Sequence, residues 1–76
     1  MNLPIYSSED DINLCEEIVR KFLDKDKVIY ADKQLRDITI DVMNISYSHG
    51  GGYTKDIILG FCQGYFSKKL YQKFVD

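Results

Sequence analysis

Proline, tryptophan, cysteine and histidine are all scarce in this chain of 76 residues, which holds one proline, no tryptophan, two cysteines and one histidine. The low proline content, together with a hydrophobic fraction of 45%, argues against a disordered chain. One histidine and two cysteines that form no Cys-x-x-Cys pair cannot complete a typical structural zinc site. The length leaves room for one small domain over residues 1–76 and excludes large enzyme folds such as the TIM barrel.

An excess of basic charge is also lacking. Ten lysines and arginines stand against 12 aspartates and glutamates, for a formal net charge of −2. Dedicated nucleic-acid-binding domains usually carry a basic patch or stripe, so nucleic acid is the less favoured partner. No apolar run approaches the length of about 18 residues that a membrane-spanning helix needs. Residues 1–7 have neither the basic start nor the apolar stretch of a signal peptide, so we expect an N-terminal arm on a soluble, cytoplasmic protein.

The two cysteines, Cys15 and Cys62, both lie among apolar neighbours. Reduced cysteines in protein cores have such surroundings, because a thiol behaves there as a small apolar side chain. We therefore expect two buried thiols rather than a disulfide.

Residues 8–25 have the clearest helical pattern. Ser7 and Ser8 precede three acidic residues, which is typical of a helix start: a serine can cap free amides, and acids favour the positive end of the helix dipole. Apolar residues then recur at spacings of three and four, as one buried helix face requires. They are Ile12, Cys15, Val19 and Phe22.

Residues 32–47 fit two structures. Residues 37–42 alternate between polar and apolar side chains, as a half-buried strand does. A longer stripe with helical spacing runs through the same region and favours a helix with Asp32 as its N-cap. Its positions are Ala31, Leu35, Ile38, Val42 and Ile45.

Three glycines, Gly50 to Gly52, are typical of a helix end, and Thr54 can cap a third helix over residues 54–74. The sequence therefore predicts an all-α fold, a small bundle of three helices near residues 8–25, 32–47 and 54–74. The alternative is an α+β fold of two helices with a short strand or ribbon. That strand would come from residues 3–6, 28–30 or 37–42.

No set of residues points to catalysis. Cys62 and His49 could form a nucleophilic pair only with an orienting third group, and the chain is too short to build a substrate cleft around them. Asp37 and Asp41 lie one helical turn apart, but acids at exposed helix positions are ordinary. We expect no enzyme activity, no cofactor and no metal.

The third helix contains an unusual row of small residues. Gly60, Gly64 and Ser67 recur at i, i+4 and i+7, and each glycine inside a helix costs roughly 1 kcal/mol relative to alanine. A close helix–helix crossing would explain that cost. We expect the crossing within the monomer, with a crossing between two copies as the alternative.

The six tyrosines exceed what a small core can bury with every hydroxyl satisfied, so several should lie at a binding surface or at the rim of the core. If the protein binds its partner through the third helix, the candidate contact is an exposed face formed by Gly60, Gly64, Tyr65 and Tyr71. The full set of candidate partner-binding residues is Tyr53, Gly60, Gly64, Tyr65, Ser67, Lys68 and Tyr71.

Glycine amides at the start of a helix, beside a lysine, can hold an anion. The candidate residues are Gly50, Gly51, Gly52 and Lys55, although a plain turn between helices is the favoured interpretation.

The hypothesis from these patterns is a small non-enzymatic protein-binding module. It would act as a regulator or inhibitor by occupying a surface of a larger macromolecule, and a homodimer is one form it can take. The alternative is a nucleic-acid-binding protein that uses the lysines and tyrosines of its C-terminal helix. Size and composition are typical of small accessory proteins of bacteriophages and mobile elements.

Overall fold

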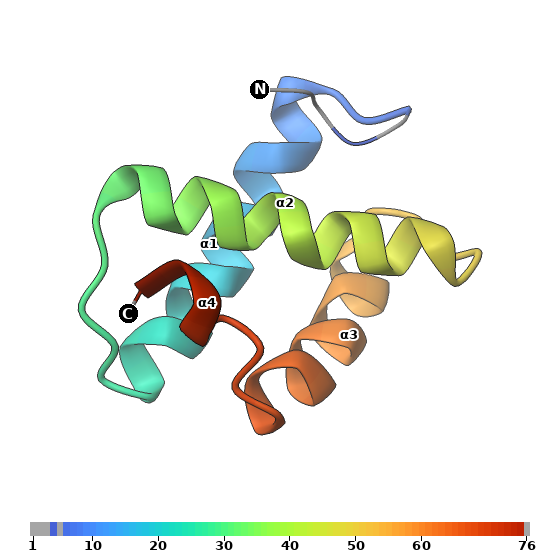
Figure 1. The fold of residues 1–76 in the computed structure, drawn as a ribbon. Helices are drawn as coiled ribbons and strands as arrows, with labels where there is room; N and C mark the ends of the chain where they lie inside the picture. Colours follow the sequence, from blue (N-terminus) through green and yellow to red (C-terminus); the bar gives the residue numbers. More distant parts are fainter. Residues whose placement is uncertain (1–3, 5, 76) are drawn as a thin grey trace.

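Helices joined by short loops make up the part of the chain that the computed structural model describes, which is Pro4 and residues 6–75 (Figure 1). The helices are α1 (Glu9–Lys25), α2 (Asp32–Ser48), α3 (Lys55–Ser67) and the short α4 (Gln72–Val75). The predicted all-α bundle is confirmed, with its three long helices packed against one another. The alternative α+β fold is wrong for residues 28–30, which form a loop, and for residues 37–42, which lie inside α2. Residues 1–3 and 5, which include half of the proposed strand over residues 3–6 and more than half of the arm over residues 1–7, lie outside the described part.

Helix α1 begins as its sequence predicts. The Asp11 amide donates a hydrogen bond to Ser8 Oγ (3.2 Å), and the Ser8 amide donates in return to Asp11 Oδ2 (3.0 Å). This reciprocal capping box satisfies two amides that the first turn leaves without helical partners.

Helix α2 forms instead of a strand because a helix buries the longer apolar stripe, of which Leu35, Ile38 and Val42 are buried. The β-branched Thr39 fits this helix because its hydroxyl donates to the Leu35 carbonyl one turn back (2.7 Å). The predicted N-cap is wrong by one residue, since Ala31 occupies that position and Asp32 lies in the first turn.

Glycine ends α2. Gly50 has φ +80°, a left-handed conformation that suits glycine, and its amide donates to the Tyr47 carbonyl (3.0 Å). The Gly51 amide donates to the Ser46 carbonyl (2.8 Å). These two bonds form a Schellman motif, which closes the last turn of the helix.

The expected continuous helix over residues 54–74 is wrong. Helix α3 stops at Ser67, and Lys69 adopts φ 55° in the turn that follows. The turn brings Tyr71 into the core, where its ring packs on Phe66 with 5.2 Å between centroids. It also returns α4 onto α2, where Gln34 Nε2 donates to the Phe74 carbonyl (3.0 Å) (Figure 1). If the helix continued straight beyond Ser67, Phe66 and Tyr71 would lie on different faces, and they could not both be buried on the same side.

The core lies where α1, α2 and α3 meet, and it includes both cysteines. Cys15 and Cys62 are free thiols with no exposed surface, so the prediction of buried thiols is confirmed. Burial raises the pKa of Cys15 to about 11 and that of Cys62 to about 12. Among the described residues, no helix is long and apolar enough to cross a membrane.

Candidate functional site

Gly60 and Gly64 lie on the solvent-exposed side of α3. A Cβ atom built on either glycine would meet no atom within 4 Å. The expected close helix–helix crossing within the monomer is therefore wrong, because none of the described segments approaches this row. Each glycine costs roughly 1 kcal/mol relative to alanine, and the folded monomer gains no packing in exchange.

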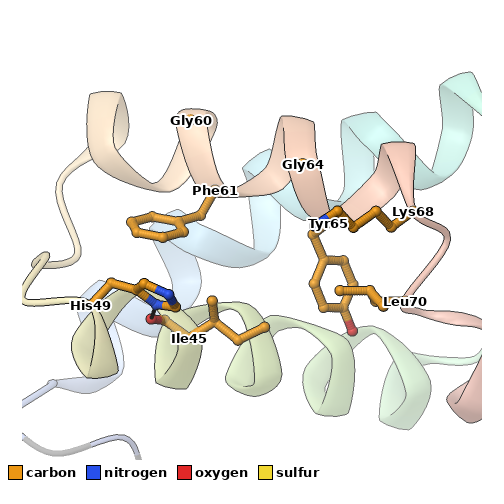
Figure 2. A pocket seen from close by; sticks show the side chains of 8 residues that line it. All are labelled: Ile45, His49, Gly60, Phe61, Gly64, Tyr65, Lys68 and Leu70. Atoms are coloured by element: carbon orange, nitrogen blue, oxygen red, sulfur yellow. Dashed lines mark hydrogen bonds between the residues drawn. The ribbon is translucent and has the colours of Figure 1, made fainter.

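A shallow groove of about 230 Å³ lies beside these glycines, between α2 and α3 (Figure 2). We call it the α2–α3 groove. Its lining residues are Ile45, His49, Gly60, Phe61, Gly64, Tyr65, Lys68 and Leu70. Apolar side chains dominate this set, and Leu70 has 42% of its surface exposed.

One end of the groove is formed by His49 and Phe61. Their rings lie 5.6 Å apart between centroids, and Figure 2 shows the Phe61 ring across the groove from His49. His49 Nδ1 lies 2.8 Å from the Ile45 carbonyl oxygen. Because a carbonyl only accepts hydrogen bonds, Nδ1 is the protonated nitrogen, and this bond holds the imidazole in place.

Tyr65 reaches from α3 across to α2 (Figure 2). Its hydroxyl donates to Asp41 Oδ2 (2.8 Å), and Lys73 Nζ lies 3.2 Å from the same oxygen. Burial, followed by the hydrogen bond and negative charge of Asp41, raises the pKa of the Tyr65 hydroxyl. Tyr65 therefore lines the groove with its ring while its polar end is fixed to the bundle.

The exposed tyrosine face of the sequence prediction is not present. Tyr65 is 3% exposed and Tyr71 is 6% exposed. The turn after Ser67 is the reason for the burial of Tyr71, and the Asp41 bond is the reason for the orientation of Tyr65. The two glycines of that face are exposed.

Of the remaining candidate partner-binding residues, Lys68, Ser67 and Tyr53, only Lys68 lines the groove. Lys68 is exposed and lines one end of it. Ser67 is exposed but lines a separate hollow beside Phe22 and Phe66. Tyr53 is half-buried in the loop before α3, where burial raises the pKa of its hydroxyl.

The triple-glycine segment serves the fold. The amides of Gly50 and Gly51 already donate to carbonyls at the end of α2, so they are not free to bind an anion. A Cβ on Gly51 would lie 2.8 Å from Ser46 Oγ, so this glycine is needed for a close approach. The Ser46 hydroxyl in turn donates to the Gly52 carbonyl (2.6 Å). Lys55 is exposed in the first turn of α3.

The acidic pair of α2 is also engaged within the fold. Lys33 Nζ lies 2.8 Å from Asp37 Oδ2, and Asp41 accepts from Tyr65 and pairs with Lys73. In the ranges that the structure describes, no three potential metal-ligating side chains come together.

The helix segments that supply most of the groove residues contain no charged residue. No charged residue occurs between Ile57 and Ser67, and none occurs between Asn44 and Ser48. Asp56 and Lys68 are the charged residues that flank the α3 segment. Depletion of charge with enrichment of aromatic residues is the composition of a protein-interface core.

Sequence reasoning missed four groove residues, namely Ile45, His49, Phe61 and Leu70. Ile45 belongs to the apolar stripe of its helix, which predicted a place in the core. The exposure of Leu70 depends on the turn after α3, which the helical pattern did not predict. The only feature of the sequence that pointed to this groove was the uncharged segment of 11 residues from Ile57 to Ser67.

Comparison with known protein families, with curated proteins and with solved structures finds no match to this chain.

Proposed function

We propose that this protein is a small, non-enzymatic protein-binding module that acts as a regulator or inhibitor by covering a surface of a larger macromolecule. Its binding face is the α2–α3 groove with the adjoining glycines, Gly60 and Gly64. The observation that supports this proposal is that two helix-interior glycines are open to solvent beside an apolar groove. These glycines destabilise the helix, and no segment of the monomer packs on them. Contact with another molecule would explain why glycine occupies both positions.

The geometry suits a helix of the partner. Without side chains at Gly60 and Gly64, a second backbone can approach α3 closely, as it does at other glycine-containing helix crossings. An apolar side chain of the partner would then enter the groove over Phe61. Recognition of this kind, in which a helix lies along an apolar groove, is a common mode of peptide binding.

The alternative of nucleic-acid binding by the C-terminal helix has less support. Helix α3 ends before the lysines, so Lys68, Lys69 and Lys73 do not form one helical stripe. Lys73 is already paired with Asp41. The groove itself is apolar and mostly uncharged, whereas phosphate backbones require several basic side chains.

The test is affinity capture from extracts of the source organism, with wild-type protein and two variants as bait. Gly64→Leu places a large side chain at the glycines, whereas Asn13→Leu adds the same side chain at an exposed position of α1. We expect a protein retained by wild type and Asn13→Leu to be lost from Gly64→Leu, with circular dichroism confirming that both variants fold. Identical retention by all three baits would contradict the proposed binding face.

A further inference from the structure

We propose that two copies of this chain form a dimer by exchanging their C-terminal segments, residues 68–75. In this dimer α3 and α4 join into one straight helix, and the C-terminal segment of each copy packs where the other copy's segment packs in the monomer. The proposal does not depend on what binds the α2–α3 groove. It is carried by the turn at Lys69 and by the contacts of the segment that follows it.

The surface beneath the C-terminal segment already has a known occupant. The Tyr71 ring packs on Phe66 with 5.2 Å between centroids, and Gln34 Nε2 donates to the Phe74 carbonyl (3.0 Å). Figure 1 shows α4 lying against α2 in this closed form. Both contacts join residues on opposite sides of the turn. They therefore re-form unchanged between two chains when the segment of one copy takes the place of the other's.

The turn itself opposes the monomer. Lys69 has φ 55°, a left-handed conformation that is less favourable than the right-handed one by a factor of about 5–30 for a residue with a Cβ. Residues 67–71 contain neither glycine nor proline, and lysine and leucine are good helix formers. A straight helix through this segment removes the left-handed residue. The continuous helix over residues 54–74 that the sequence predicts is thus the form expected in the dimer.

The straight form cannot bury its aromatic residues within its own chain. At about 100° per residue, Tyr71 and Phe74 would lie about 120–180° around such a helix from the buried Ile58 and Cys62. They would face away from the core that α3 covers. Only a second molecule could then bury them, and a second copy offers the surface that they already fit.

The exchange should be reciprocal and the dimer weak. Each copy gives and receives one segment, so two turns are released while the core contacts are kept. The entropy lost on association offsets this gain at low concentration, so the monomer should dominate there. Exchange requires Tyr71 to leave the core, where it is 6% exposed, so the dimer should form on refolding rather than on simple concentration.

Refolding of the full chain from urea at about 1 mM, followed by size-exclusion chromatography with light scattering, measures the dimer. Lys69→Gly removes the strain of the left-handed turn and disfavours the straight helix. Because a dimer contains two such positions, its dissociation constant should rise at least about 25-fold. Lys69→Val makes the left-handed turn less favourable still and should strengthen the dimer.

Lys27→Gly is the matched control. Lys27 has φ 58° and, like Lys69, lies two residues after the last residue of a helix. Its turn is present in both the monomer and the dimer, so glycine there should leave the dissociation constant unchanged. Circular dichroism should show that both glycine variants fold, which separates loss of the dimer from loss of the fold.

Nuclear magnetic resonance of a mixed dimer distinguishes exchange from surface contact. Chains labelled with ¹³C are refolded together with unlabelled chains, and an isotope-filtered experiment detects only contacts between different chains. Exchange predicts a cross-peak between the Tyr71 ring of one chain and the Phe66 ring of the other. A dimer formed by any other surface keeps this contact within each chain and gives no such peak.

Each outcome decides the proposal. Wild type and Lys69→Val that both remain monomeric after refolding at about 1 mM would overturn it. So would a dimer without the cross-peak between chains, or one that Lys69→Gly weakens no more than Lys27→Gly does. Loss of the dimer on Lys69→Gly alone, together with the cross-peak in wild type, would support the exchange.

Discussion

Replacing the two exposed glycines by alanine should stabilise the monomer. Neither Gly60 nor Gly64 has a positive φ, and a Cβ at either position meets no atom within 4 Å. Alanine therefore adds no clash and removes the backbone entropy that a helical glycine loses on folding. Each substitution should raise the free energy of unfolding by about 0.5–1 kcal/mol, and the pair by about 1–2 kcal/mol.

Thermal melting followed by circular dichroism measures this effect. For a domain of this size, 1 kcal/mol corresponds to about 4–8 °C in Tm, so the double variant should melt about 5–15 °C above wild type. Wild type and variants should be compared at one low protein concentration, so that any binding between chains contributes equally to each Tm. Urea titration gives the same free energy independently.

Two other glycines are matched controls with the opposite sign. Gly51→Ala places its Cβ 2.8 Å from Ser46 Oγ and 3.1 Å from the Ser46 carbonyl oxygen, so it should destabilise the protein. Gly50→Ala forces alanine to φ +80° and should cost about 1 kcal/mol. A fall in Tm for Gly60→Ala or Gly64→Ala would refute the reasoning, because it would show that the folded monomer uses those glycines. Higher stability together with weaker capture of a partner protein would show that they serve binding.

Three further predictions concern the fold that holds the groove. Tyr65→Phe should lower the free energy of unfolding by about 1–2 kcal/mol in urea titrations, because it removes the hydrogen bond to Asp41; no change would mean that water replaces the hydroxyl. Burial raises the pKa of Cys62 from 9.0 to about 12, so the folded state favours the neutral thiol. The stability that this thiol contributes below pH 9 should be lost as the pH rises towards 12. In urea titrations over that pH range, the free energy of unfolding of Cys62→Ala should fall less steeply than that of wild type. Ser8→Ala should cost about 1 kcal/mol, whereas Thr54→Ala should cost less because the Thr54 side chain makes no capping bond; equal losses of Tm would contradict the assigned caps.

The elements that were predictable are those determined by local pattern. Helix α1 has both a periodic apolar face and a serine cap, and it begins within one residue of its predicted start. The conflict over residues 37–42 was resolved in favour of the longer apolar stripe, because burial in a bundle requires a face that continues along the whole helix. The glycine end of α2 followed from the need for a left-handed conformation at Gly50.

The elements that were missed depend on contacts between distant segments. Apolar residues recur in the third helical segment both before Ser67 and after it, at Leu70, Tyr71 and Phe74, so the sequence gives no sign of a break. Only the packing of Tyr71 against Phe66 shows that the helix ends there. Glycine spacing shows that α3 has a small-residue face, but it does not show whether that face is turned inward or outward. The groove was missed for the same reason, since it exists only where α2 and α3 lie side by side.

The uncharged segment between Ile57 and Ser67 has a second consequence, which concerns the unfolded chain. Eleven consecutive residues without charge or proline, rich in isoleucine and aromatic residues, have the composition of a segment that assembles into cross-β fibrils. Gly60 and Gly64 interrupt that segment with residues that are depleted from strands, so they also limit its aggregation while the bundle is open. A variant in which both are replaced by valine should therefore aggregate faster when unfolded than one in which both are alanine, even if the two fold equally well.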